Sequence, residues 1–156
     1  MREFTKISPQ LWDCDGFRGQ DDTARLAYLY LLSNSHQNSV GCYRLPAAYA
    51  SADLEWPPQK WERALEALIG AGLVKYDMET REVFISDWFQ HNPPTNAKHH
   101  LGCERLIDKI KSSTFREKTK GDLETVPKKW NSYGPQSTGL GKHLWETPRM
   151  RSALGQ

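Results

Sequence analysis

The amino-acid sequence predicts an α+β fold, and three observations support this prediction. Three segments between residues 21 and 70 carry helical signals, and two short β-prone segments follow between residues 73 and 86. Runs rich in Pro, Gly or small polar residues separate these segments. The 156 residues are 38% hydrophobic and 11% aromatic, which is sufficient for one domain with a sizeable core and excludes a chain that is disordered throughout.

The first predicted helix begins near Asp21 and Asp22, because their carboxylates can accept hydrogen bonds from the first free N–H groups of a helix. Residues 26–32 continue this helix and are apolar on every face, which predicts a central helix surrounded by neighbours. The polar run 33–39 ends it, and residues 41–45 are predicted to form a short strand.

Prolines mark the start of two further helices. Pro46 is suited to the first turn of a helix over residues 46–54, and Pro57 and Pro58 precede a longer one. Gly72 would end the longer helix. Its predicted inward-facing stripe consists of Trp61, Ala64, Leu65, Leu68 and Ile69.

Residues 73–77 and 82–86 are predicted strands that pair through the four residues between them, in a connection built around a type I turn. The element order is then helix, strand, helix, helix and hairpin, which is typical of a winged helix-turn-helix. In that fold the helix before the hairpin can enter the major groove of DNA while the hairpin touches the backbone. Many such domains bind proteins instead, so the fold alone does not decide function.

Residues 12–94 carry three phrases that resemble a known family: ARLAYLYLLSNSHQNSVGCYRLP, ALEALIGAGLVKYD and ISDWFQHNPPTN. They look like the N-terminal winged-helix region of phage replisome-organiser or replication-initiation proteins. The resemblance covers roughly the first two thirds of the chain. It implies a DNA-binding module joined by a linker to regions that contact origin DNA, replication partners or a helicase loader.

A domain boundary is predicted near residue 92, because Asn92-Pro93-Pro94-Thr95-Asn96 is a stiff connector. Residues 1–92 would form the winged-helix domain, and residues 93–156 a linker, an amphipathic helix over 97–111 and a basic, partly irregular arm. Residues 1–96 carry nine Lys and Arg against thirteen Asp and Glu, whereas residues 97–156 carry twelve against six. This basic segment is either a solvated surface or the electrostatic footprint of a nucleic-acid partner.

The predicted nucleic-acid contacts lie in two groups. The first consists of Gln59, Lys60 and Arg63 on the third helix and Lys75 and Arg81 along the wing. The second consists of Lys98, Arg105, Lys109, Lys128 and Lys129, which would neutralise phosphates, and Trp130, which would stack on bases. Glu62 and Glu66 lie among the first group. Because of their negative charge, the same surface could instead be an ordinary solvated face or a protein-binding face. The arm's aromatic residues would equally serve to pin it to the body or to a partner.

No phosphate-binding loop, nucleophile elbow, His-Glu-x-x-His or dinucleotide motif occurs in the sequence, so we predict no enzyme and no cofactor. His99-His100-x-x-Cys103 has no matching second pair of ligands, and we predict no metal site. The acidic pair Asp13 and Asp15 would suit a divalent ion, whereas helix capping explains Asp21 and Asp22.

These observations predict a non-catalytic, phage- or prophage-type DNA-binding protein of the replication-initiation class. The alternative is a phage-encoded adaptor or inhibitor whose winged helix binds a protein or nucleoprotein complex of the replication or defence machinery. The longest apolar run, residues 26–32, is too short to cross a membrane, and the N-terminus lacks an apolar leader. Three well-separated cysteines suit free thiols, so we expect a cytoplasmic protein of a bacterial host cell. Its oligomeric state stays open.

Overall fold

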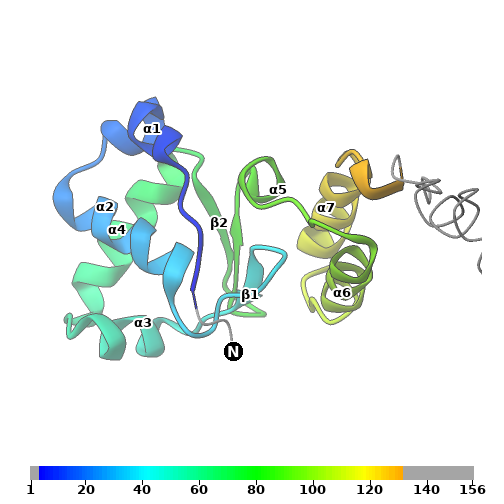
Figure 1. Cartoon of the computed structure of the whole chain (residues 1–156). Coiled ribbons are helices and arrows are strands. Elements are labelled where there is room, and N and C mark those ends of the chain that lie inside the picture. The colour runs from blue at the N-terminus through cyan, green and yellow to red at the C-terminus, as the bar shows by residue number, and fades with distance from the viewer. Residues whose placement is uncertain (1–3, 132–156) are drawn as a thin grey trace, which may run out of the picture.

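The computed structural model describes residues 4–131, which form an α+β fold of seven α-helices and one three-stranded antiparallel sheet (Figure 1). Residues 132–156, which contain the last part of the predicted arm, lie outside the described residues. Two 3-10 helices lie at Pro9–Asp13 and Lys129–Asn131. The other elements are α1 (Asp15–Arg18), α2 (Asp22–Ser33), β1 (Cys42–Arg44), α3 (Ala47–Leu54), α4 (Pro58–Gly70), β2 (Val74–Asp77), β3 (Glu82–Ile85), α5 (Trp88–His91), α6 (Ala97–Ile107) and α7 (Ser113–Glu124).

The predicted start of α2 and both predicted ends of α4 are confirmed. The Asp21 carboxylate accepts a hydrogen bond of 2.7 Å from the backbone N–H of Ala24 and so caps α2. α4 begins directly after Pro57, and Gly72 follows its end with a left-handed φ of +72°. These local signals fix where the helices begin and end.

The sheet has the strand order β1-β3-β2, with both pairs antiparallel. Val83 in the centre of β3 lies opposite Tyr43 of β1 and Tyr76 of β2. Because Asp77 pairs with Glu82, the β2–β3 connection has the four residues that the sequence predicts. β2 and β3 thus form a hairpin, and β1 joins it along the far edge of β3.

Helices cover both faces of the sheet, which gives three layers (Figure 1). On one face, the hydroxyl of Tyr43 donates a hydrogen bond of 2.6 Å to the carbonyl of Leu31 in α2. On the other face, the ring of Phe84 lies 5.6 Å from the ring of Phe115 in α7. All four residues of β3 are therefore buried.

The hydrophobic core is continuous across the predicted domain boundary near residue 92. Cys103, Ile107 and Phe115, which follow that boundary, belong to the same buried cluster as Phe84 and the other core residues of the first part. α6 and α7 therefore contribute to the core of the sheet-containing unit.

The predicted, partly irregular arm contains a regular helix, α7, because three widely spaced buried side chains, Phe115, Thr119 and Leu123, suffice to dock it. Two predictions about individual side chains are wrong. Ile69 is 42% exposed rather than inward-facing, since it lies at the edge of the apolar stripe of α4. Leu26 is 49% exposed, so α2 is not surrounded by neighbours on every side.

Candidate nucleic-acid interface

The helix α4 presents the first group of predicted contact residues to solvent. Gln59, Lys60 and Arg63 are all exposed. The opposite side of α4, with Trp61, Ala64, Leu65 and Leu68, is buried in the core. The N-terminal half of α4 therefore exposes one amide and two cationic side chains on a helix that is anchored along its other side.

Aromatic contacts fix the start of α4 against α2 and against the turn that precedes it. The ring of Trp61 meets the ring of Tyr30 edge-on at 5.9 Å, and the Tyr30 hydroxyl donates a hydrogen bond of 2.6 Å to the Asp53 carboxylate. Burial and this hydrogen bond raise the pKa of Tyr30 above its usual value. The Lys60 ammonium stands 4.4 Å from the centre of the Trp56 ring, a cation–π contact that holds the charge near the α3–α4 turn.

The hairpin carries the other two residues of the first group, Lys75 and Arg81, and both are exposed. Its loop has a defined shape, because Asp77 Oδ1 accepts backbone hydrogen bonds from Glu79 at 2.9 Å and Thr80 at 3.2 Å. A side-chain hydrogen bond from Ser112 and the backbone hydrogen bond from Thr80 lower the pKa of Asp77.

A groove of about 520 Å³ separates α4 from the hairpin. On the α4 side it is lined by Glu62, Glu66 and Ile69, and on the hairpin side by Met78 and Arg81. Of the first group, Arg81 lines this groove, whereas the three α4 residues and Lys75 do not. The structure therefore brings only Arg81 of the first group to this groove, opposite the carboxylates of Glu62 and Glu66, and places the predicted cations of α4 outside it.

Sequence reasoning missed this groove. Met78 was treated as part of a connecting loop, yet its side chain is 80% exposed at the groove edge. The two carboxylates of Glu62 and Glu66 were noted only as neighbours of Lys60 and Arg63. Their spacing of four residues was the signal available, because it places both on one flank of a helix.

The helix α6 presents a basic stripe that the sequence predicts. Lys98, Arg105 and Lys109 are all exposed. Lys98 and Arg105, seven residues apart, share one side of α6, and Lys109 lies in the turn that follows the helix. The opposite side of α6, with His100, Cys103 and Ile107, is buried. No ion pair or side-chain hydrogen bond within residues 4–131 engages these three cations.

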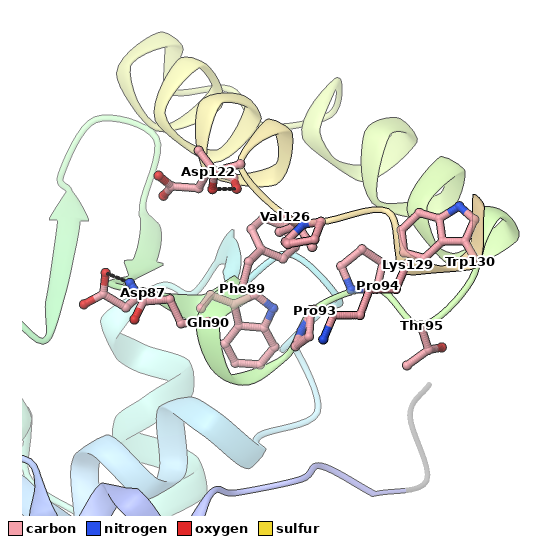
Figure 2. A pocket seen from close by; sticks show the side chains of 13 residues that line it. Asp87, Phe89, Gln90, Pro93, Pro94, Thr95, Asp122, Val126, Lys129 and Trp130 are labelled. Carbon is pink, nitrogen blue, oxygen red and sulfur yellow. Dashed lines mark hydrogen bonds between the residues drawn. The ribbon is translucent and has the colours of Figure 1, made fainter. Parts of the chain in front are cut away.

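The last predicted residues, Lys128, Lys129 and Trp130, lie at the end of the described chain. Lys129 and Trp130 line a cavity of about 500 Å³, together with apolar side chains that include Trp88, Phe89, Pro93 and Pro94 (Figure 2). The ring of Trp130 lies 5.6 Å from that of His100 in α6, and Trp130 is half-buried. This contact pins the chain to α6, and base stacking by Trp130 stays a prediction.

Within residues 4–131, no group of three or more His, Cys, Asp or Glu side chains is arranged to hold a metal ion. His100 and Cys103 instead lie on the buried side of α6. No helix in this part of the chain is long and apolar enough to cross a membrane.

Comparisons of the chain with protein-family models, with curated proteins and with solved structures find no match. Function is therefore inferred from the fold, the surface charges and the contacts of residues 4–131.

Proposed function

We propose that the chain is a non-catalytic, phage-type DNA-binding protein of the replication-initiation class. In this proposal α2, α3, α4 and the three strands form a winged helix-turn-helix, and α4 is the helix that enters the major groove. The observation that carries it is the N-terminal half of α4, which exposes Gln59, Lys60 and Arg63 while its other side is buried in the core.

The chemistry of these side chains suits two kinds of contact with duplex DNA. Gln59 and Arg63 lie one helical turn apart, and an amide and a guanidinium are the groups that read adenine and guanine edges by paired hydrogen bonds. Lys60, held at the α3–α4 turn, would contact phosphate, as would Lys75 and Arg81 on the wing. The basic stripe of α6 would add contacts that do not depend on base sequence.

The test selects duplexes from a randomised pool with the full chain and measures their affinity by fluorescence anisotropy. We expect an enriched motif, and Arg63→Ala should weaken binding to it by about tenfold or more and relax preference at one or two base pairs. The matched control is Arg18→Ala, which removes the same charge from α1, at the opposite end of α4 (Figure 1). The proposal fails if no motif is enriched, or if both variants bind equally.

A second candidate is an adaptor or inhibitor whose winged helix binds a protein or nucleoprotein complex. The observation that favours it is the charge of α4, where the exposed carboxylates of Glu62 and Glu66 offset Lys60 and Arg63. Under this proposal the affinity for DNA is weak and insensitive to Arg63→Ala. The same titrations therefore separate the two candidates.

A further inference from the structure

We propose that the groove between α4 and the β2–β3 hairpin binds helix α6 of a second copy of this chain, so that the copies associate head to tail. This inference goes beyond DNA binding and does not depend on it. It rests on the shape, the exposed apolar side chains and the charges of two surfaces of the same molecule.

The hairpin side of the groove is held in place by hydrogen bonds. The Tyr76 hydroxyl donates a hydrogen bond of 3.0 Å to the carbonyl of Leu45. Asp77 accepts two backbone hydrogen bonds from the loop, and Arg81 adopts a left-handed φ of 57° at its end. Met78, the first loop residue, is thus presented on a turn of defined shape rather than on a loose loop.

Both walls of the groove expose apolar side chains. Met78 is 80% exposed on the hairpin side and Ile69 is 42% exposed on α4. A methionine is adaptable enough to fit against a varied apolar surface. Covering these side chains with an apolar partner would remove them from water, which is favourable.

The charges of the groove are divided between its walls. Glu62 and Glu66 lie one turn apart on the α4 wall, are exposed, and have no ion-pair partner within residues 4–131. Arg81 lies on the opposite wall. An occupant that fits this groove has cations along one flank, an anion along the other, and an apolar side chain between them.

Helix α6 has that pattern on its outer side. Leu101 is 46% exposed at the centre. At 100° per residue, Lys98 and Arg105 fall on one side of Leu101, and Glu104 falls on the other. The cationic flank would face Glu62 and Glu66 while the acidic flank faces Arg81. At about 1.5 Å per residue, α6 spans about 16 Å and α4 about 20 Å, so their lengths match.

The two surfaces of one molecule cannot meet each other. α4 and α6 lie on opposite faces of the sheet (Figure 1). The contact is therefore between molecules, and because it joins two different surfaces it leaves a free groove at one end and a free α6 at the other. Such a contact continues beyond the dimer, into a ring if the rotation between copies closes and into an open chain if it does not.

The test measures the mass of the full, nuclease-treated chain by sedimentation at low salt over a range of concentrations up to several hundred micromolar. We expect weak association that continues beyond the dimer and decreases with added salt. The groove variant Glu62→Arg/Glu66→Arg and the helix variant Lys98→Glu/Arg105→Glu should each weaken association by about tenfold or more, because like charges then face each other.

The decisive sample is an equimolar mixture of the two variants. Each variant alone should associate about tenfold or more weakly than the wild type, but the mixture should recover the association, because each groove then meets an α6 of opposite charge. The matched controls are Glu79→Arg on the hairpin and Lys118→Glu on α7, which change exposed charges outside both surfaces and should leave association unchanged. Far-ultraviolet circular dichroism and thermal unfolding establish that each variant is folded.

Three outcomes would overturn the proposal: a wild-type chain that stays monomeric at the highest concentration, association that stops at a dimer, or a mixture that stays monomeric. Association by the groove variant at wild-type strength, with loss only in the helix variant, would also overturn it and would leave α6 as a surface for phosphate. DNA affinity, measured on the same variants, reports on the proposed function separately.

Discussion

The carboxylate of Glu82 on β3 accepts a hydrogen bond of 2.8 Å from the backbone N–H of Ser112, the residue that precedes α7. Its second oxygen accepts another of 2.9 Å from the backbone N–H of Lys111. Glu82 is only 4% exposed, so a strand residue satisfies N–H groups at the start of a helix thirty residues later in the chain. This arrangement fixes α7 to the sheet.

We expect Glu82→Ala to lower the free energy of unfolding by about 2–3 kcal/mol, because the buried N–H of Ser112 and the partly buried N–H of Lys111 lose a charged acceptor. Glu82→Gln keeps one acceptor oxygen and should lose about half as much. Urea unfolding followed by tryptophan fluorescence measures both values. The control is Glu79→Ala, whose side chain is exposed on the hairpin. Equal stability of the Glu82→Ala and Glu79→Ala variants would mean that the carboxylate does not secure α7.

The backbone at Gly41 has no room for a side chain. Its φ is +66°, and a Cβ there would lie 2.4 Å from Cγ of Trp88. Trp88 cannot easily move, because its indole N–H donates a hydrogen bond of 2.9 Å to the carbonyl of Ser39. Gly41→Ala should therefore combine the strain of a left-handed residue with overpacking. We expect it to lower the free energy of unfolding by about 3 kcal/mol or more.

Gly72→Ala separates these two effects, because Gly72 has a φ of +72° but open space around its Cβ position. We expect Gly72→Ala to lower the free energy of unfolding by about 1 kcal/mol, which is the cost of the left-handed conformation alone. Thermal unfolding of the two variants gives the comparison. If Gly72→Ala proves as destabilising as Gly41→Ala, contact with Trp88 is not the cause.

Local signals in the sequence were sufficient to predict the helices, strands and turns between residues 21 and 86. Helix ends are set by residues that act on neighbouring backbone groups, here Asp21, Pro57 and Gly72. The position of these ends can therefore be predicted without knowledge of the tertiary structure. The exposure of the predicted cations Lys60, Arg63 and Arg105 followed from the same helical periodicity.

Features that depend on distant parts of the chain could not be predicted in this way. α7 has few apolar residues, and its docking depends on Phe84 and Glu82, which lie about thirty residues earlier. The groove next to Met78 exists only because the hairpin folds beside α4. Both depend on how elements pack, which a single sequence does not reveal.

The thiol of Cys42 should make stability dependent on alkaline pH. Burial, and then the nearby charge of Glu82, raise the pKa of Cys42 from 9.0 to about 12. The neutral thiol is therefore favoured in the folded state. Its contribution to the free energy of unfolding is fully present below pH 9. Above pH 9 the unfolded thiol loses its proton first, so stability falls as the pH rises toward 12.

Cys42→Ala should flatten the decline in the free energy of unfolding between pH 9 and pH 10, before tyrosines ionise. Urea unfolding at a series of pH values measures this slope. The wild-type chain, measured over the same pH series, provides the reference slope. A slope that Cys42→Ala does not change would assign the decline to other groups.

The basic stripe of α6 should control how strongly DNA binding depends on salt. Each phosphate neutralised contributes about 0.9 to the slope of log K against log salt concentration, because counterions are released. If Lys98, Arg105 and Lys109 all contact phosphate, the triple alanine variant should lower that slope by about 2.7. Lys118→Ala is the control, because the Lys118 ammonium is already paired with Asp122 on α7 and should alter the slope little. Fluorescence anisotropy with a duplex of random sequence gives both slopes. A triple variant with the wild-type slope would mean that α6 does not contact phosphate. The proposed binding of α6 to the α4–hairpin groove of a second copy would then be its one remaining role in these proposals.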